Sequence, residues 1–322
     1  MKALDLVLIN PNSRAQVYQS LGNELTAVEN PVWAGLMANF CRARGLSAEV
    51  IDAEAEGLSV SEVADRVAHL NPVLAAVVAY GHQPSASTQI MTAVGRTCSA
   101  VKASCPEQRV LLVGGHVAAL PERTLREEEA DFVAAGEGLT TLFGLTQALK
   151  SPVPNLDAVP GLLRRDGGRV IRNPEPPLTL NLDAELPGIA WDLLPMSRYR
   201  AHNWHCLGGR DRQPYAALYT TLGCPYHCSF CCIQAPFKNG EVAALGERQK
   251  PNSYRFWSVE HVVGQIDRLV NEYGVRNIKI ADEMFVLNRR HVVGLCDAII
   301  ERRYDLNIWA YTRVDTIKDG ML

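Results

Sequence analysis

The sequence predicts an α/β protein, in which a doubly wound parallel sheet is followed by the first half of a second domain of strands and helices. Two observations support this prediction. Residues 1–150 repeat a short β-branched run, a turn and an amphipathic helix, and the same alternation resumes at residue 214. Strands that alternate with crossover helices form parallel sheets. With 322 residues, the chain is long enough for two domains with separate cores.

Composition and charge exclude several classes of protein. A net charge of −3 gives no basic field, so nucleic acid is not an expected partner. No apolar run approaches the roughly 20 residues needed to cross a bilayer, so no membrane association is expected. The first apolar run ends at Asn10-Pro11 and is too short for a signal peptide. Nine cysteines without a secretory segment therefore predict reduced thiols and a cytoplasmic protein.

Residues 1–150 are expected to form one domain of five parallel strands, each buried on both faces. The expected strands are Asp5–Asn10, Ala48–Ala53, Leu74–Gly81, Arg109–His116 and Asp131–Gly138. The expected helices are Val32–Arg44, Ser61–Leu70, Ser87–Ser104, Pro121–Glu128 and Leu139–Lys150. Ser61 followed by Glu62 is expected to begin the second of these helices, and Gly45 follows the end of the first.

Glycine-rich or polar loops follow the last three of these strands. They are Gly81-His82-Gln83-Pro84-Ser85, Gly114-Gly115-His116 and Gly136-Glu137-Gly138. Ligands bind parallel sheets outside the carboxyl ends of the strands, and glycine lets the backbone approach a flat ligand closely. The first strand is not followed by a G-x-G-x-x-G motif, so a dinucleotide is a poor candidate. Tight strand–helix turns are the alternative explanation for these glycines.

Residues 151–213 are rich in proline and are expected to form a hairpin and an interdomain linker that packs against both neighbours. The hairpin is expected at Gly161–Arg172, with its turn at Asp166-Gly167-Gly168. The alternation then continues through residues 214–322, where the expected elements are strand Tyr215–Thr220, helix Ser258–Tyr273, strand Asn277–Ala281, helix Asn288–Tyr304 and strand Asn307–Asp315. Three parallel strands are an incomplete domain with an exposed edge, so we expect the chain to be a C-terminal truncation of a longer protein.

Three cysteines follow the first strand of the second half at C-x-x-x-C-x-x-C spacing, namely Cys224, Cys228 and Cys231. Three thiolates can bind three irons of a cubane [4Fe-4S] cluster and leave the fourth iron open to another ligand. Zinc, with Cys232 or His227 as a fourth ligand, is the alternative, although the paired C-x-x-C arrangement of many zinc sites is missing.

This cysteine motif, with the aromatic Phe230 just before its third cysteine, resembles the cluster loop of radical S-adenosylmethionine enzymes. The resemblance implies a [4Fe-4S] cluster whose open iron binds S-adenosyl-L-methionine, and a 5′-deoxyadenosyl radical formed by its reductive cleavage. It also implies a partial TIM-like barrel, of which this chain supplies about half, and an electron donor such as flavodoxin or ferredoxin.

The same resemblance implies further contacts to S-adenosyl-L-methionine. They are expected from Phe230 in the loop, from Asp282 and Glu283 after the second barrel strand, and from Arg313 at the end of the third. The alternatives are a helix-capping acid pair and a solvated arginine at a strand end. No catalytic residue is predicted.

The first half resembles the Rossmann-like cobalamin-binding domain that precedes the radical domain in one branch of that family. The matching residues, which are expected to bind cobalamin, are Ser85, Gly114, Gly115, His116, Gly136, Glu137 and Gly138. One departure is informative, because the D-x-H-x-x-G motif that supplies a cobalt-binding histidine in methionine-synthase-type domains is missing from Asn10–Ala15. The resemblance therefore implies cobalamin held without a protein histidine on cobalt.

These features together predict a cobalamin-dependent radical S-adenosylmethionine enzyme that acts on a small-molecule substrate. Methyl transfer to an unactivated carbon, through the 5′-deoxyadenosyl radical and methylcobalamin, is the favoured reaction. A radical cyclase or rearrangement enzyme that uses cobalamin without methyl transfer is one alternative. A zinc-stabilised binding protein without catalytic activity is another.

Overall fold

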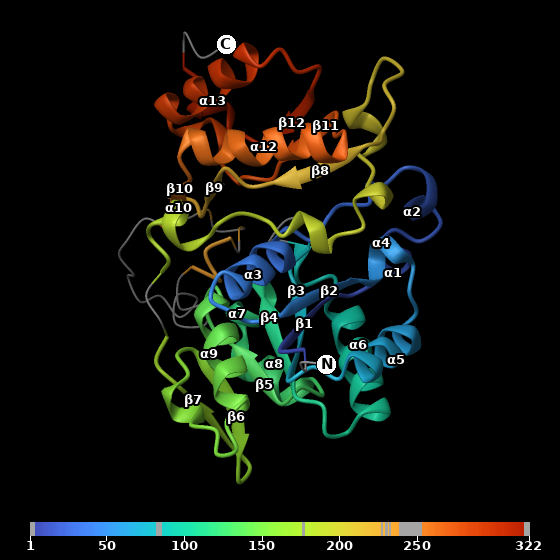
Figure 1. Cartoon of the computed structure of the whole chain (residues 1–322), viewed down its shortest axis with the longest axis vertical. Coiled ribbons are helices and arrows are strands. Elements are labelled where there is room, and N and C mark those ends of the chain that lie inside the picture. Colours follow the sequence, from blue (N-terminus) through green and yellow to red (C-terminus); the bar gives the residue numbers. More distant parts are fainter. Residues whose placement is uncertain are drawn as a thin grey trace.

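The computed structural model describes residues 4–81, 86–175, 178–226, 228, 231, 233–237 and 253–318. The N-terminal and C-terminal halves each contain a sheet with helices packed on it, and the two halves are stacked along the long axis of the molecule (Figure 1). Among the described residues, none of the helices combines the length and apolar character needed to cross a membrane.

The first half is built on a seven-stranded sheet with the strand order β2-β1-β3-β4-β5-β6-β7. Its strands are β1 Leu6–Asn10, β2 Ala48–Asp52, β3 Leu74–Ala79, β4 Val110–Gly114, β5 Phe132–Ala134, β6 Leu162–Asp166 and β7 Arg169–Arg172. The first five are parallel, as predicted, and β6 and β7 are antiparallel. The predicted hairpin therefore forms, and it extends the first sheet at the β5 edge.

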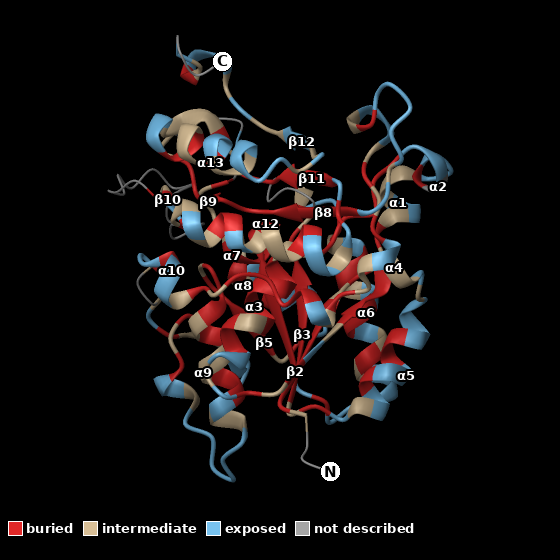
Figure 2. Ribbon diagram, turned by 45° about the horizontal axis from the view of Figure 1, so that its top comes forward, coloured by how far each residue is buried: buried red, intermediate tan, exposed pale blue. Residues whose placement is uncertain are grey.

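Alternate residues of the parallel strands face two different cores, one on each face of the sheet. On β1, Leu6 and Leu8 belong to one core, whereas Val7 and Ile9 belong to the other. The buried residues are concentrated in the strands and in the inner faces of the helices (Figure 2). This burial on both faces explains why the strands are nearly continuous apolar runs.

The helices of the first half follow the predicted order, with short additional turns at the loops. They are α1 Arg14–Tyr18, α2 Leu21–Glu24, α3 Val32–Arg42, α4 Ala53–Glu56, α5 Val60–Leu70, α6 Met91–Ser104, α7 Gly115–Ala119, α8 Pro121–Glu127 and α9 Leu139–Leu149. The predicted start of α5 at Ser61 is wrong. Ser59 is the N-cap and forms a capping box with Glu62, because the hydroxyl at Ser59 lies three residues before that glutamate.

The segment between the halves contacts both of them through side chains. Tyr199 donates a 2.7 Å hydrogen bond to Asp52 at the end of β2. Trp191 is fully buried, and its indole donates a 2.9 Å hydrogen bond to Gln265 of the second half. A short helix, α10 Leu182–Glu185, lies in the same segment. Packing against both neighbours, as predicted for the linker, is therefore observed.

The second half contains a three-stranded parallel sheet with the order β12-β11-β8. Its elements are β8 Tyr215–Leu218, β9 Thr221–Leu222, β10 Arg255–Phe256, α12 Val259–Tyr273, β11 Asn277–Ile280, α13 Arg289–Glu301 and β12 Asn307–Ala310. The strands β9 and β10 form a small antiparallel pair beside this sheet. Ser258 caps α12 and Gly274 ends it in the left-handed conformation, as predicted.

Buried polar contacts join the two halves. The Lys279 ammonium on β11 lies 2.9 Å from both carboxylate oxygens of Glu29, and both side chains are buried. The Asn30 side chain accepts a hydrogen bond from the backbone N–H of Ala217 on β8, at 2.6 Å, and donates one to the Ala217 carbonyl, at 2.9 Å. These contacts join the segment before α3 to β8 and β11 of the second sheet.

Candidate cofactor and active site

The cysteine loop leaves the carboxyl end of β8, and its first part is held by Ser253. The Ser253 hydroxyl lies 3.4 Å from the Cys224 amide nitrogen and 3.3 Å from the Cys224 carbonyl oxygen. Gly223 has a φ of +78°, and a Cβ atom there would lie 2.3 Å from the Ser253 carbonyl oxygen. Glycine is therefore required where the chain turns into the loop.

The three predicted cluster ligands differ in exposure. Cys224 is buried, Cys228 is half-buried and Cys231 is exposed, and the Cys231 amide donates a 3.0 Å hydrogen bond to the Cys228 carbonyl. Burial raises the pKa of Cys224, and a backbone hydrogen bond at Tyr226 opposes this increase, while Glu283, Cys231 and Cys228 add to it. The three thiols thus share one loop, and this donor set fits an iron–sulfur cluster with one open iron.

In the part of the chain that the structure describes, no three His, Cys, Asp or Glu side chains are gathered closely enough to bind a metal ion as they stand. Phe230 lies outside the described residues, as do Cys232 and His227, the two candidates for a fourth zinc ligand. The choice between an iron–sulfur cluster and zinc therefore stays a prediction.

Arg313 lies beside the second cysteine of the loop. A guanidinium nitrogen of Arg313 is 3.6 Å from the Cys228 sulfur, and the guanidinium lies over the Tyr226 ring, 4.1 Å from its centroid. Asp315 pairs with the same guanidinium at 2.7 Å. This position, next to the cysteine loop, is compatible with the predicted contact to S-adenosyl-L-methionine, which stays a prediction.

Asp282 is fully buried after β11, and both of its carboxylate oxygens are occupied. The amides of Thr220 and Thr221 donate to it at 2.6 and 3.1 Å, and the Thr220 hydroxyl donates at 2.5 Å. Burial raises the pKa of Asp282 to about 6, although these hydrogen bonds oppose the increase. Asp282 therefore fixes the chain that leads from β8 into the cysteine loop.

Glu283 differs from its neighbour because its Oε2 atom is fully buried and has no hydrogen-bond partner among the described residues. Burial raises the pKa of Glu283 to about 8, and the charge of Asp282 raises it as well, while Arg255 lowers it. A buried carboxyl oxygen without a donor is costly, and a ligand donor would satisfy it. Of the two predicted acids, Glu283 is the one with a free acceptor.

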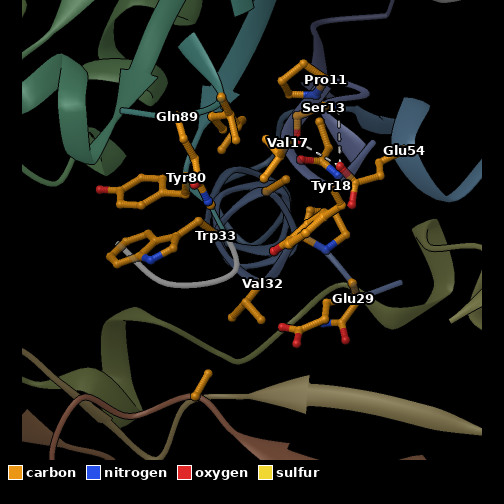
Figure 3. A pocket seen from close by; sticks show the side chains of 18 of the residues that line it. Pro11, Ser13, Val17, Tyr18, Glu29, Val32, Trp33, Glu54, Tyr80 and Gln89 are labelled. Carbon is orange, nitrogen blue, oxygen red and sulfur yellow. Dashed lines mark hydrogen bonds between the residues drawn. The ribbon is translucent and has the colours of Figure 1, made fainter. Parts of the chain in front are cut away.

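A pocket opens where the carboxyl ends of β1 and β3 face the second half, and Figure 3 shows its side chains. The rings of Trp33 and Tyr80 are stacked, with centroids 4.5 Å apart, and form one wall. Glu54 accepts hydrogen bonds from the amide and the hydroxyl of Ser13, at 3.3 and 3.0 Å, in the loop after β1. Tyr219, which follows β8, lines the pocket from the second half, and so does Ala281 after β11.

The side chains of this wall are not among the residues predicted from the sequence. Tyr80 follows β3 directly, so its position at a carboxyl end was a usable signal. Trp33, in contrast, is close to the start of α3 and lies far from Tyr80 in sequence. Only the tertiary packing brings the two rings together.

The glycine loops after β4 and β5 are explained in part by packing. A Cβ atom at Gly114 would lie 2.2 Å from the Ala79 carbonyl oxygen on β3, and one at Gly138 would lie 2.2 Å from a Val113 methyl group. These two positions therefore support the tight-turn explanation, and their contact with cobalamin stays a prediction. Gly115 begins α7, and Gly136 adopts a φ of +68°.

The other residues predicted to bind cobalamin lie in distinct surroundings. The Nδ1 atom of His116 is 3.1 Å from the Thr88 hydroxyl, and burial lowers the pKa of His116. Glu137 is buried and accepts hydrogen bonds from the Thr179 amide, at 3.1 Å, and from Arg255, at 2.7 Å. Ser85 lies outside the described residues.

Comparison with curated proteins finds related enzymes, although no family model matches the chain. An uncharacterized methyltransferase of Pyrococcus horikoshii is 28% identical over 99% of this chain and 62% of its own length. An anaerobic magnesium-protoporphyrin IX monomethyl ester cyclase of Cereibacter sphaeroides is 25% identical, over 97% of this chain and 46% of its own. The hopanoid C-3 methylase of Methylococcus capsulatus is 27% identical, over 89% of this chain and 48% of its own length. The chain therefore spans about half to three-fifths of the length of these relatives.

Solved structures with the same fold include two radical S-adenosylmethionine enzymes. OxsB, a cobalamin-dependent enzyme with aqua-cobalamin and S-adenosylmethionine bound, matches with a TM-score of 0.70 at 18% identity, over 100% of this chain and 40% of its own. The methyltransferase TsrM from Kitasatospora setae, with cobalamin and a [4Fe-4S] cluster bound, matches with a TM-score of 0.64 at 19% identity. The match covers 94% of this chain and 52% of the TsrM chain.

The fold and the cysteine loop thus define a class. The chain is an α/β protein with the fold of radical S-adenosylmethionine enzymes. The comparisons narrow this class further. The sequence relatives include a methyltransferase, a methylase and a cyclase. The structural neighbours include the cobalamin-dependent enzyme OxsB and the methyltransferase TsrM. The resemblance inferred from the sequence is therefore confirmed.

Proposed function

We propose that this protein is a cobalamin-dependent radical S-adenosylmethionine enzyme that transfers a methyl group to an unactivated carbon of a small molecule. One observation carries the proposal. The cysteine loop leaves the carboxyl end of β8, and the strand ends next to it, at Tyr219 and Ala281, face the carboxyl ends of β1 and β3 across one pocket. Parallel sheets bind ligands at these ends, so two cofactors would meet over one substrate cavity.

Cys224, Cys228 and Cys231 would bind a [4Fe-4S] cluster. When bound, the cluster with S-adenosyl-L-methionine supplies radical chemistry, and cobalamin supplies methyl transfer. The free Oε2 of Glu283 would accept a hydrogen bond from S-adenosyl-L-methionine, and Arg313 would attract its carboxylate. Phe230 is proposed to contact the same cofactor.

Cobalamin would lie at the carboxyl ends of the first sheet. The stacked rings of Trp33 and Tyr80 form an aromatic wall there, which would limit the access of water. The glycine loops after β4 and β5 lie at the same edge, and Ser85 is proposed to contact cobalamin as well. The loop after β1 runs through Asn10 and Ser13 and contains no histidine, so it offers no imidazole to cobalt. An electron donor such as flavodoxin or ferredoxin is also proposed.

Anaerobic reconstitution tests the proposal. The protein is incubated with iron, sulfide and hydroxocobalamin, and the iron, sulfide and corrin retained are measured with the ultraviolet–visible spectrum. We expect four irons and four sulfides, as one [4Fe-4S] cluster requires, and one corrin per chain. Cys224→Ser should lose the cluster, whereas the matched control Cys296→Ser, at an exposed position on α13, should keep it. One zinc per chain with no iron or sulfide would overturn the proposal.

A cyclase reaction is the second candidate, because one relative is a magnesium-protoporphyrin IX monomethyl ester cyclase. The products distinguish the two reactions. Methyl transfer yields both S-adenosylhomocysteine and 5′-deoxyadenosine, whereas radical cyclisation without methyl transfer yields 5′-deoxyadenosine alone.

A further inference from the structure

We propose that Arg255 is a positioning residue that ties the Gly136–Gly138 loop of the first half to the first cysteine of the cluster loop. The functional meaning of this inference rests on the proposed function, because the two loops that Arg255 joins are those expected to bind the two cofactors. Its structural part depends only on contacts between described side chains. The sequence predicts Glu137 as a cobalamin contact, and it carries no signal for Arg255.

The first link is an ion pair between the two halves. Arg255 and Glu137 are 6% and 7% exposed, and a guanidinium nitrogen lies 2.7 Å from Glu137 Oε1. The other Glu137 oxygen accepts the Thr179 amide at 3.1 Å, and a second guanidinium nitrogen donates to the Thr179 carbonyl at 2.6 Å. Both charges are thus paired, and the hydrogen bonds that a buried pair needs are present.

The second link runs from Arg255 into the cysteine loop. The third guanidinium nitrogen, Nε, donates to the Ser253 carbonyl at 3.1 Å, and the Ser253 hydroxyl contacts both the amide and the carbonyl of Cys224. Arg255 also pairs with Leu222, two residues before Cys224, in the β9–β10 ladder. A continuous network therefore joins Glu137 to the backbone that carries the first thiol.

The guanidinium geometry explains why arginine stands here. Its three nitrogens donate to Glu137, Thr179 and Ser253, in three separate segments, and its plane lies near the Phe237 ring, 5.2 Å from the centroid. A lysine ammonium is a single compact charge and cannot reach all three acceptors. Because partners behind the ligands set the geometry of a metal site, this network would fix the distance between the cluster loop and the first sheet.

Thiol alkylation in the protein without cofactors tests the network. Cys224 is buried, so its reaction with iodoacetamide, followed by peptide mass spectrometry, reports local opening of the loop. We expect Glu137→Gln and Ser253→Ala each to accelerate the alkylation of Cys224 at least about tenfold. Arg255→Lys keeps the charge but loses two of the donor positions, and it should give a smaller acceleration in a folded protein.

The matched control is Glu29→Gln, which breaks a second buried ion pair between the halves without touching the cysteine loop. It should accelerate the alkylation of Cys224 clearly less than Glu137→Gln does, because it does not contact the cysteine loop. Equal acceleration by Glu29→Gln and Glu137→Gln would mean general loosening and would overturn the proposal, and so would no acceleration by Ser253→Ala.

A second readout links the network to cofactor binding. Glu137→Gln should retain less iron than Glu29→Gln after anaerobic reconstitution, and equal retention would show that the network does not position the cluster loop. If the wild type retains no iron at all, the proposed function fails. The alkylation comparison still decides whether the network exists, so the two failures are distinguishable.

Discussion

Asp52→Asn is expected to change how the stability of this protein depends on pH. Asp52 is fully buried at the end of β2, where it accepts hydrogen bonds from Asn10, at 2.8 Å, from Tyr199, at 2.7 Å, and from the Ala55 amide, at 3.1 Å. An asparagine can retain all three bonds, because its oxygen can accept from Asn10 and Ala55 while its amide donates to the Tyr199 hydroxyl. The substitution therefore removes an ionisable group with little change in packing.

The size of the effect follows from the pKa of Asp52. Burial raises this pKa from its ordinary value of 3.8 to about 6, against the effect of the three hydrogen bonds. A raised carboxyl pKa gives stability that is fully present below pH 3.8 and is lost as the pH rises through about 6. At 1.36 kcal/mol per pKa unit, the free energy of unfolding of the wild type should fall by about 3 kcal/mol over this range. The variant lacks the carboxyl group and should not show this loss.

Urea unfolding at a series of pH values from about 4 to 8 measures the difference in the free energy of unfolding. We expect the free energy of unfolding of Asp52→Asn to increase relative to that of the wild type as the pH rises. Most of this increase should be complete by about pH 7. Asp65→Asn, at an exposed position on α5, is the control and should follow the wild type. Parallel profiles for Asp52→Asn and the wild type would refute the reasoning.

Three further features are tested by substitution and urea unfolding: a buried ion pair, a glycine that packs against a neighbouring strand and a helix cap. Glu29→Gln leaves a buried ammonium without its carboxylate and should cost about 3–5 kcal/mol, whereas a loss below about 1 kcal/mol would show a solvated pair. Gly114→Ala places a Cβ atom 2.2 Å from the Ala79 carbonyl and should cost more than about 4 kcal/mol, while Gly264→Ala, with open space on α12, should gain about 0.5–1 kcal/mol. Equal effects of the two glycine substitutions would contradict the packing argument. Ser59→Ala removes the N-cap of α5 and should cost about 1 kcal/mol, and no change would mean that the cap is not formed in solution.

The sequence predicted the strands of this fold well, because a strand that is buried on both faces must be apolar along its whole length. The runs at Leu6–Asn10 and Leu74–Ala79 show this, and both form parallel strands at the expected places. Helix starts were less predictable. Ser59 and Ser61 both precede Glu62, and the S-x-x-E spacing of a capping box, which only Ser59 has, is the signal that distinguishes them.

The candidate site was predicted in part. The spacing of the cysteines identified the loop, because ligands close in sequence can share one metal site. The partner of Glu137 could not be predicted in this way. Arg255 lies 118 residues away and meets it only after the two halves pack together. The different roles of Asp282 and Glu283 could not be predicted from the sequence either. The two acids are adjacent and chemically similar, but they differ entirely in their hydrogen-bond partners.

The contact between Asn30 and Ala217 also bears on how the second sheet avoids unwanted strand pairing. The strand β8 lies at an edge of its sheet, and an edge strand exposes N–H and C=O groups that can recruit another chain. The amide of Asn30 occupies both backbone groups of Ala217, as a neighbouring strand would do. One side chain from the first half therefore blocks strand addition at the middle of β8, so the packing that forms the pocket also covers this sheet edge.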